Sequence, residues 1–188
     1  MVDRITIGKQ LRGFAAGMEI EFRSGVNLLV GDQGCGKSTL LTALENAGLF
    51  FPGAGINVEM RGSTVIRSHD FEKLNPRLST ALGGSVSTGL QMQRLFASHG
   101  QSTVMILAEI CKRDVAPGTT FLFDEPDTGL SVRSCKAVAR FFRMLAGQGH
   151  QVIAAVHNPM LFLAFEWVYS VEHKAWMKPG EFLDTQLS

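Results

Sequence analysis

One short run of residues has the composition of a phosphate-binding loop. From Gly31 to Ser38 the sequence GDQGCGKS fits the pattern G-x-x-x-x-G-K-[ST]. Glycines let successive backbone N–H groups converge on phosphate oxygens, and the N-terminus of a following helix adds its positive end. We expect Lys37 to reach the β- and γ-phosphates and the Ser38 hydroxyl to ligate Mg²⁺. The residues expected to contact the phosphates are Gly31, Gln33, Gly34, Cys35, Gly36, Lys37, Ser38 and Thr39.

Two adjacent acidic residues supply the complementary chemistry. The apolar stretch from Thr119 to Phe123 reads as a buried strand and ends in Asp124 and Glu125. A carboxylate at the end of such a strand suits the Mg²⁺ shell, so Asp124 is the expected metal ligand together with Ser38. Glu125 is placed to orient and deprotonate an attacking water. Taken alone, an acidic pair is equally typical of a solvated strand end, but its position downstream of the phosphate loop favours the catalytic interpretation.

The elements around these motifs alternate between apolar strands and helices. Strands are expected at 26–30, 119–123 and 152–156, and helices at 37–47 and 132–145. Such alternation predicts an α/β fold with a mainly parallel central sheet covered by helices on both faces. Ligands bind such sheets at the carboxyl ends of the strands, which is where the polar motifs fall.

The N-terminal part has a different pattern. Residues 5–7 and 18–23 alternate apolar and polar side chains, as half-buried strands do. Residues 58–60 and 64–67 are expected to form a second, antiparallel pair. We therefore predict an N-terminal antiparallel β subdomain built from about 1–25 and 56–68, within a single domain spanning 1–188.

Composition excludes several classes of protein. The chain has 188 residues, 45% of them apolar and 19% charged, so it can bury a core and is not disordered. A net charge of +1 excludes nucleic-acid binding driven by overall charge, and the sequence shows no obvious basic stripe. The three cysteines have neither disulfide nor zinc spacing. Without a membrane span or signal peptide in the sequence, the expected location is the cytoplasm, with no membrane insertion.

Three stretches together resemble the ATP-binding-cassette (ABC) class of P-loop ATPases. FDEPDTGLS, at 123–131, is similar to that class's second nucleotide motif running into its D-loop, and VIAAVHNP, at 152–159, is similar to its switch-histidine strand. EIEFRSGVNLLVGDQGCGKSTLLTAL, at 19–44, is closer to the SMC/RecF branch and its small stand-alone "predicted ATPase" relatives than to transporter subunits. The resemblance covers nearly the whole chain. It implies a P-loop NTPase fold, ATP rather than GTP, and Mg²⁺.

The resemblance also assigns roles to single residues. His157 would contact the γ-phosphate or the attacking water, which makes Lys37, Glu125 and His157 the expected catalytic set. A histidine that ends a strand is otherwise most often only a strand cap.

The signature loop of this class, whose serine and glycine amides cap the γ-phosphate of a partner subunit, has two candidates. SHGQS, from Ser98, is similar to the S-H-G-E-S variant of the small ATPases, and STGLQ, from Ser87, is similar to the S-T-G-E-Q of RecF-like proteins. A helix at about 98–114 followed by the Pro117–Gly118 turn fills the interval before the Asp124 strand. Starting at Ser87 would place a glycine inside the helix, at about 1 kcal/mol. Spacing therefore favours Ser98, Gly100 and Gln101, with a plain helix cap at Ser98 as the other interpretation.

The sequence departs from the family pattern in several places. His99 and Gln101 replace the usual glycine and glutamate of the signature, and no glutamine lies between Gln33 and Gln91 to serve as the Q-loop residue. His69 or Asp70 could substitute there, although a solvated turn is the simpler interpretation. Phe14 could stack on adenine or belong to the core.

These observations predict an ATP-binding and ATP-hydrolysing protein that forms a homodimer on ATP. Hydrolysis would be coupled to a partner, such as DNA or a nuclease or other effector, in DNA maintenance, phage biology or defence. Two alternatives stay open. One is the ATPase subunit of a membrane transporter, and the other is a largely non-hydrolysing ATP switch.

Overall fold

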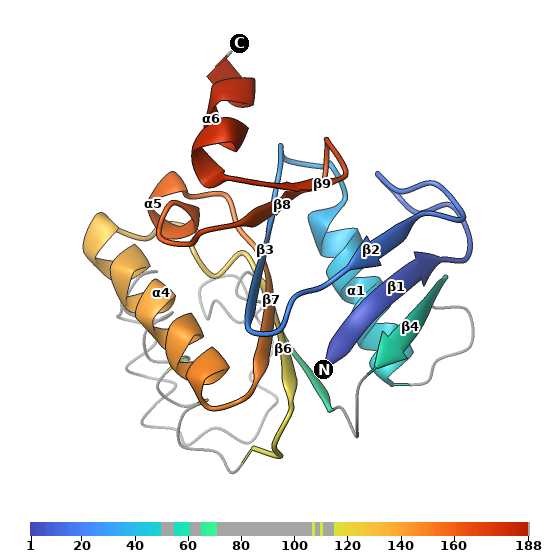
Figure 1. Cartoon of the computed structure of the whole chain (residues 1–188). Coiled ribbons are helices and arrows are strands. Elements are labelled where there is room, and N and C mark those ends of the chain that lie inside the picture. Colours follow the sequence, from blue (N-terminus) through green and yellow to red (C-terminus); the bar gives the residue numbers. More distant parts are fainter. Residues whose placement is uncertain (50–54, 61–64, 71–106, 108–109, 111–114, 188) are drawn as a thin grey trace, which may run out of the picture.

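The computed structural model describes residues 1–49, 55–60, 65–70, 107, 110 and 115–187 (Figure 1). Within them, a six-stranded sheet has the order β5-β6-β7-β3-β8-β9. Its strands are β3 (Val26–Val30), β5 (Ile66–Asp70), β6 (Thr120–Asp124), β7 (Gln151–Ala155), β8 (Val168–Ser170) and β9 (Ala175–Met177). The first five in this sheet run parallel and only β9 is antiparallel to its neighbour. The predicted α/β class with a mainly parallel sheet is therefore confirmed.

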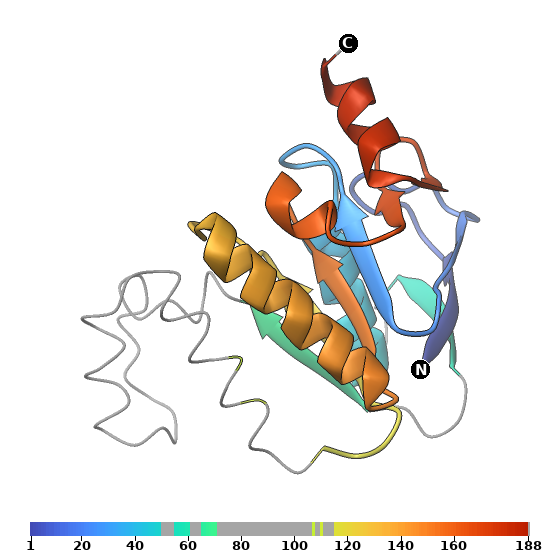
Figure 2. The same cartoon turned by 60° about the vertical axis from the view of Figure 1, so that its left-hand side comes forward.

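Helices cover both faces of this sheet, as Figures 1 and 2 show. They are α1 (Lys37–Gly48) on one face and α4 (Val132–Gly147) with α5 (Pro159–Phe162) on the other, whereas α6 (Pro179–Leu187) extends beyond β9 toward the C-terminus. Successive strand residues point to opposite faces, so Phe121 and Phe123 pack with α4 whereas Leu122 packs with α1. The helices α1 and α4 follow the sequence expectations within two residues at each end. In the described part of the chain, no helix has both the length and the apolar character needed to cross a bilayer.

The N-terminal strands form a separate antiparallel sheet of order β2-β1-β4, with β1 at Val2–Ile7, β2 at Glu19–Glu21 and β4 at Ile56–Met60. This confirms the antiparallel β element, with one correction. The expected antiparallel pairing of 58–60 with 64–67 is wrong, because β4 pairs with β1 whereas β5 pairs in parallel with β6. The antiparallel sheet thus includes residues 56–60 but not the strand that follows.

One buried side chain joins the two sheets. Gln151, at the start of β7, is 1% exposed. Its Oε1 accepts from the Val2 backbone N–H at 2.8 Å and from the Thr120 hydroxyl at 2.9 Å. Its Nε2 donates to the backbone oxygens of Val2 at 2.8 Å and Arg23 at 3.0 Å. All four hydrogen-bonding positions of the amide are therefore used.

We expect Gln151→Leu to lower the free energy of unfolding by about 2–4 kcal/mol, because it leaves several buried polar groups of the two sheets without partners. Urea denaturation followed by circular dichroism measures this. An exposed substitution of the same type, Gln148→Leu, is the control and should change stability by less than about 0.5 kcal/mol. Equal effects of the two substitutions would show that Gln151 does not join the sheets.

Part of the predicted structure lies outside the described residues. This applies to the signature helix at 98–114, except that Leu107 and Ile110 are helical and buried in the α4-side core. The elements after residue 157 had no counterpart in the sequence expectations. They are α5, β8, β9 and α6.

Candidate nucleotide site

The glycine-rich loop connects β3 to α1 at the carboxyl edge of the central sheet. Its last glycine, Gly36, has φ of 114° and is the N-cap of α1, so the backbone enters the helix from a conformation that favours glycine. Lys37 is only 4% exposed. Its Nζ donates to the backbone oxygens of Gly31 at 2.7 Å and Asp32 at 2.9 Å, so the ammonium lies inside the curve of the loop. A cation enclosed by a glycine turn at a helix N-terminus fits a phosphate group.

The loop after β1 packs against the phosphate loop, and the contact explains one glycine in each of the two loops. A Cβ built on Gly36 would lie 2.2 Å from the backbone oxygen of Arg12, and one on Gly13 would lie 1.9 Å from the backbone oxygen of Cys35. Neither distance is sterically possible. The loop after β1 and the phosphate loop therefore need glycine at their point of contact.

The predicted metal ligands lie together. The Ser38 hydroxyl, in the first turn of α1, donates to Asp124 Oδ1 at the end of β6 with a distance of 3.0 Å. A hydroxyl and a carboxylate at this separation form an oxygen ligand set suited to Mg²⁺. Asp70 is the cross-strand neighbour of Asp124.

Glu125 and His157 are brought into contact by two adjacent strand ends. His157 Nε2 lies 3.2 Å from Glu125 Oε1, and the Thr128 hydroxyl donates to Glu125 Oε2 at 3.2 Å. Glu125 has φ of 51°, a conformation uncommon for a residue with a side chain. Such local strain is concentrated at functional sites. The carboxylate thus has one oxygen toward the histidine and the other toward the D-loop.

Asp127 holds the histidine segment in place, a role that the sequence expectations did not include. Its Oδ2 accepts from the backbone N–H groups of His157 at 2.7 Å and Asn158 at 2.5 Å. The side chain is buried, with the residue 3% exposed, and Oδ1 has no hydrogen-bond partner among the described residues. Burial raises the pKa of Asp127, while the two backbone N–H groups act to lower it. The D-loop and the switch-histidine segment are therefore tied by one carboxylate.

Residues that follow β8 form hydrogen bonds to the phosphate loop and to the loop after β1. Glu172 Oε1 accepts from the Asp32 backbone N–H at 2.7 Å, and Glu172 Oε2 accepts from Gln186 Nε2, in α6, at 3.1 Å. Lys174 donates to the backbone oxygen of Gly13 and lies 4.5 Å from the centre of the Phe14 ring. No sequence signal pointed to these residues, because the contacts of Glu172 with Asp32 and of Lys174 with Gly13 join segments more than a hundred residues apart.

The structure also tests the roles considered for Phe14, His69 and Asp70, but not the two signature candidates. Phe14 is 2% exposed and belongs to the core, so it does not present a free face to adenine. His69 and Asp70 are the last residues of β5 and are partly buried, so the solvated-turn interpretation is wrong. Both signature candidates lie outside the described residues. They are Ser87–Gln91 and the set Ser98, Gly100 and Gln101.

Sequence comparison finds similarity to an AAA domain family, to a DNA repair protein and to proteins of the UvrABC system. A family model described as an AAA domain matches residues 8–94. The DNA repair protein RecN of Mycobacterium leprae is 39% identical over 80 residues, which are 42% of this chain and 13% of RecN. The UvrABC system protein A of Bradyrhizobium diazoefficiens is 26% identical over 144 residues, which are 74% of this chain and 14% of that protein. The chain thus spans a small part of the length of these relatives.

Structural comparison gives the same fold. UvrA2 from Deinococcus radiodurans superposes with a TM-score of 0.64 at 14% identity, covering 95% of this chain and 37% of UvrA2. An ATP-binding cassette of an ABC transporter, in its ADP conformation, superposes with a TM-score of 0.55 at 15% identity, covering 96% of this chain and 89% of the cassette. The chain has the fold of the ABC ATPases, and fold, motif geometry and sequence relatives together support an ABC-class P-loop ATPase of the SMC/RecF-like kind.

Proposed function

We propose that the protein binds Mg-ATP at the phosphate loop and hydrolyses it. The observation that carries the proposal is the pairing of Ser38 with Asp124 at 3.0 Å beside an enclosed Lys37. Two separate segments of the chain contribute, the start of α1 and the end of β6, and they meet at one edge of the sheet. A structural core contact would not require a buried lysine whose ammonium donates only within its own loop.

Different residues of the site bind the phosphates, hold the metal ion and activate the attacking water. Backbone N–H groups of the loop and the Lys37 ammonium hold the phosphates, and Ser38 and Asp124 hold Mg²⁺. When bound, the ion neutralises charge that develops on the phosphate oxygens. Glu125 accepts a proton from the attacking water as general base. His157, 3.2 Å from the Glu125 carboxylate, orients that carboxylate and the water.

Hydrolysis is coupled to opening and closing of a homodimer in this proposal. Two copies close head to tail, and Ser98, Gly100 and Gln101 of one copy cap the γ-phosphate held by the other. The resemblance of the sequence to the ABC class supports this arrangement. The names of the relatives, a DNA repair protein and a UvrABC system protein, support a partner in DNA maintenance, with phage biology and defence as related settings.

Calorimetry with Mg-ATP, release of radiolabelled phosphate and light scattering with and without ATP test the proposal. We expect uptake of one Mg-ATP per chain, measurable turnover and an ATP-dependent dimer. Lys37→Ala is the control and should weaken ATP binding by at least tenfold, because it removes the cation from the loop. A chain that takes up no Mg-ATP would refute the proposal, and uptake without turnover would favour the switch alternative. Co-purification with a membrane protein would favour the transporter alternative.

A further inference from the structure

The helix α4 carries a strongly positive charge in a chain that is nearly neutral overall. Its sequence, VRSCKAVARFFRMLAG, has four basic residues and no acidic residue, whereas the whole chain has a net charge of only +1. The four are Arg133, Lys136, Arg140 and Arg143, and all are exposed. We call this set the basic face of α4. The expectation that the chain has no basic stripe is therefore wrong, because helical spacing gathers residues that look scattered in sequence.

Helix geometry places the basic face on the side away from the sheet. At about 100° per residue, the four side chains fall within an arc of about 80°, and they extend over about 15 Å along the axis. The opposite side of the helix packs on the sheet through Cys135, Val138 and Phe142, each 0% exposed. Figure 2, in which this side of the molecule comes forward, shows α4 lying across the sheet as an outer layer.

Within the described part of the chain, no acidic side chain pairs with the basic face. Among the described residues, no hydrogen bond or salt bridge involves the side chains of Arg133, Lys136 or Arg140. Arg143 donates to the backbone oxygen of Ala164 and lies 4.9 Å from the centre of the Phe165 ring, so it keeps its charge. Glu166, which follows that segment, pairs with Lys178 at 2.9 Å.

A row of cations that have no acidic partner among the described residues fits a polyanion. The apolar side of α4 is buried in the core, so the helix cannot insert that side into a bilayer as a membrane-surface helix does. Duplex DNA carries about nine phosphate charges along 15 Å of its axis, enough to face all four cations at once. We propose that the basic face of α4 is a docking surface for the phosphate backbone of duplex DNA, without sequence preference. This surface is separate from the nucleotide site and does not depend on ATP hydrolysis.

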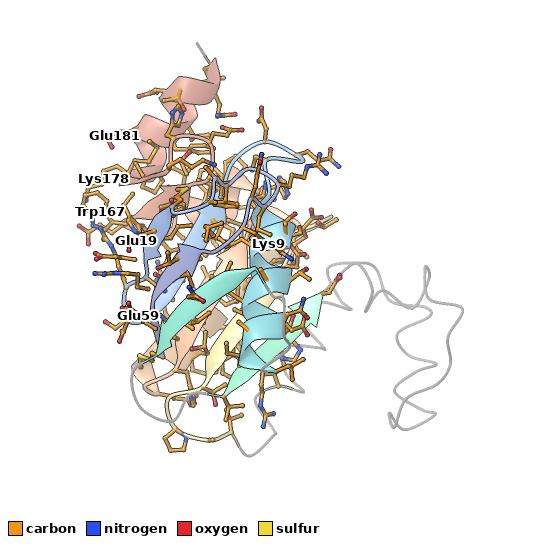
Figure 3. The ribbon with its side chains drawn as sticks, turned by 90° about the vertical axis from the view of Figure 1, so that its right-hand side faces the viewer. Lys9, Glu19, Glu59, Trp167, Lys178 and Glu181 are labelled. Carbon is orange, nitrogen blue, oxygen red and sulfur yellow. The ribbon has the colours of Figure 1, made fainter. Side chains whose placement is uncertain are left out.

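Two variants with equal charge change test the surface. Arg133→Gln/Arg140→Gln removes two cations from the basic face, whereas Arg4→Gln/Lys9→Gln removes two from the side of the antiparallel sheet. Figure 3 shows Lys9 on that side, which is turned away from α4 in Figure 1. Among the described residues, the ion pairs of Arg4 are exposed ones, with Glu21 at 2.6 Å and Glu19 at 3.9 Å, so its loss changes stability little.

The measurement is fluorescence anisotropy of a labelled 30-base-pair duplex, without nucleotide, in a salt series from 50 to 200 mM. Four phosphate contacts predict that wild-type affinity falls about 150-fold across this range, and two contacts predict a fall of about 12-fold. We expect the α4 variant to follow the second value and the Arg4/Lys9 variant to follow the first. Arg133→Lys/Arg140→Lys keeps the charge and should behave as wild type.

Three outcomes would overturn the proposal. They are equal salt dependence in the two glutamine variants, no DNA binding by the wild type at 50 mM salt, and tighter α4-dependent binding to phosphatidylserine vesicles than to DNA. Calorimetry with Mg-ATP on the same variants separates this proposal from the proposed function. The α4 variant should keep wild-type ATP affinity, so a failure of DNA docking leaves the nucleotide site unaffected.

Discussion

Glu125→Gln should lower ATP turnover at saturating Mg-ATP by at least about 100-fold, within the range that positioned general bases contribute. Glutamine has the length of glutamate and can still contact Thr128 and His157, which lie 3.2 Å from the two carboxylate oxygens. It cannot accept a proton from water. Release of radiolabelled phosphate under single- and multiple-turnover conditions measures the loss.

The same variant should keep its affinity for ATP, because Lys37, Ser38 and Asp124 are unchanged. With hydrolysis blocked, the ATP-bound dimer should accumulate and be visible by light scattering. Lys37→Ala is the matched control, which should remain a monomer in ATP. Identical elution of the two variants in the presence of ATP would contradict the coupling of nucleotide to dimer formation. A Glu125→Gln variant with wild-type turnover would instead remove Glu125 from the role of base.

The parts of the site that could be predicted from sequence are those whose chemistry is local. The loop that ends in Lys37 and Ser38 and the strand that ends in Asp124 each carry their signal within fewer than ten consecutive residues. Alternation of apolar strands and helices then places both at one sheet edge, and the pairing of Ser38 with Asp124 follows. The fold class was predictable for the same reason.

The sequence did not allow us to predict which sheet β5 joins or which strand it pairs with. Its sequence, IRSHD, has neither the continuous apolar run of a central parallel strand nor a turn that fixes its neighbour. In the described part of the sheet, β5 is an edge strand, and it pairs with β6. Its pairing depends on a partner about fifty residues later in the chain. Local alternation could give the strand but not the sheet to which it belongs.

The contacts that support the phosphate loop and the histidine segment could not be predicted from sequence for a related reason. Glu172 and Lys174 contact the phosphate loop and the loop after β1 across long sequence separations. Their residue types are ordinary in exposed turns, so only the folded structure distinguishes them. Asp127 was visible within the D-loop motif, but its bonds go to backbone N–H groups, which any residue at 157 or 158 except proline would supply.

The second large effect is expected at Asp127. Asp127→Ala removes the acceptor of two backbone N–H groups in a largely buried position, and we expect it to lower the free energy of unfolding by about 2–4 kcal/mol. Asp127→Asn keeps one oxygen for both N–H groups and places an amide NH₂ where Oδ1 lies. Because Oδ1 accepts no hydrogen bond from any residue that the structure describes, the asparagine loses no such contact there. Urea denaturation of both variants beside the wild type measures the difference.

The pH dependence follows from the raised pKa of Asp127. In the folded state this carboxyl binds its proton more readily than in the unfolded chain, where its pKa is near 3.8. The folded state therefore holds more protons between the two pKa values, and its stability falls as pH rises through that interval. Asp127→Asn has no such proton, so its stability relative to wild type should increase as pH rises above about 3.8 and then level off. A stability difference that is constant between pH 3 and 8 would contradict this assignment.

If Asp127 only stabilised the fold, replacing it would lower stability without changing the ATP turnover of the folded protein. ATP turnover therefore distinguishes a structural role of Asp127 from a role in positioning His157. Asp127 fixes the backbone of His157, and His157 contacts Glu125, so the carboxylate should act on catalysis through position. We expect Asp127→Ala to lower kcat by about tenfold or more, with little change in the KM for ATP, under conditions in which the variant is fully folded. Asp127→Asn should restore most of the rate, because the backbone N–H groups of His157 and Asn158 regain their acceptor. If Asp127→Ala turned over ATP at the wild-type rate while being destabilised, the Asp127 carboxylate would support the fold without positioning His157.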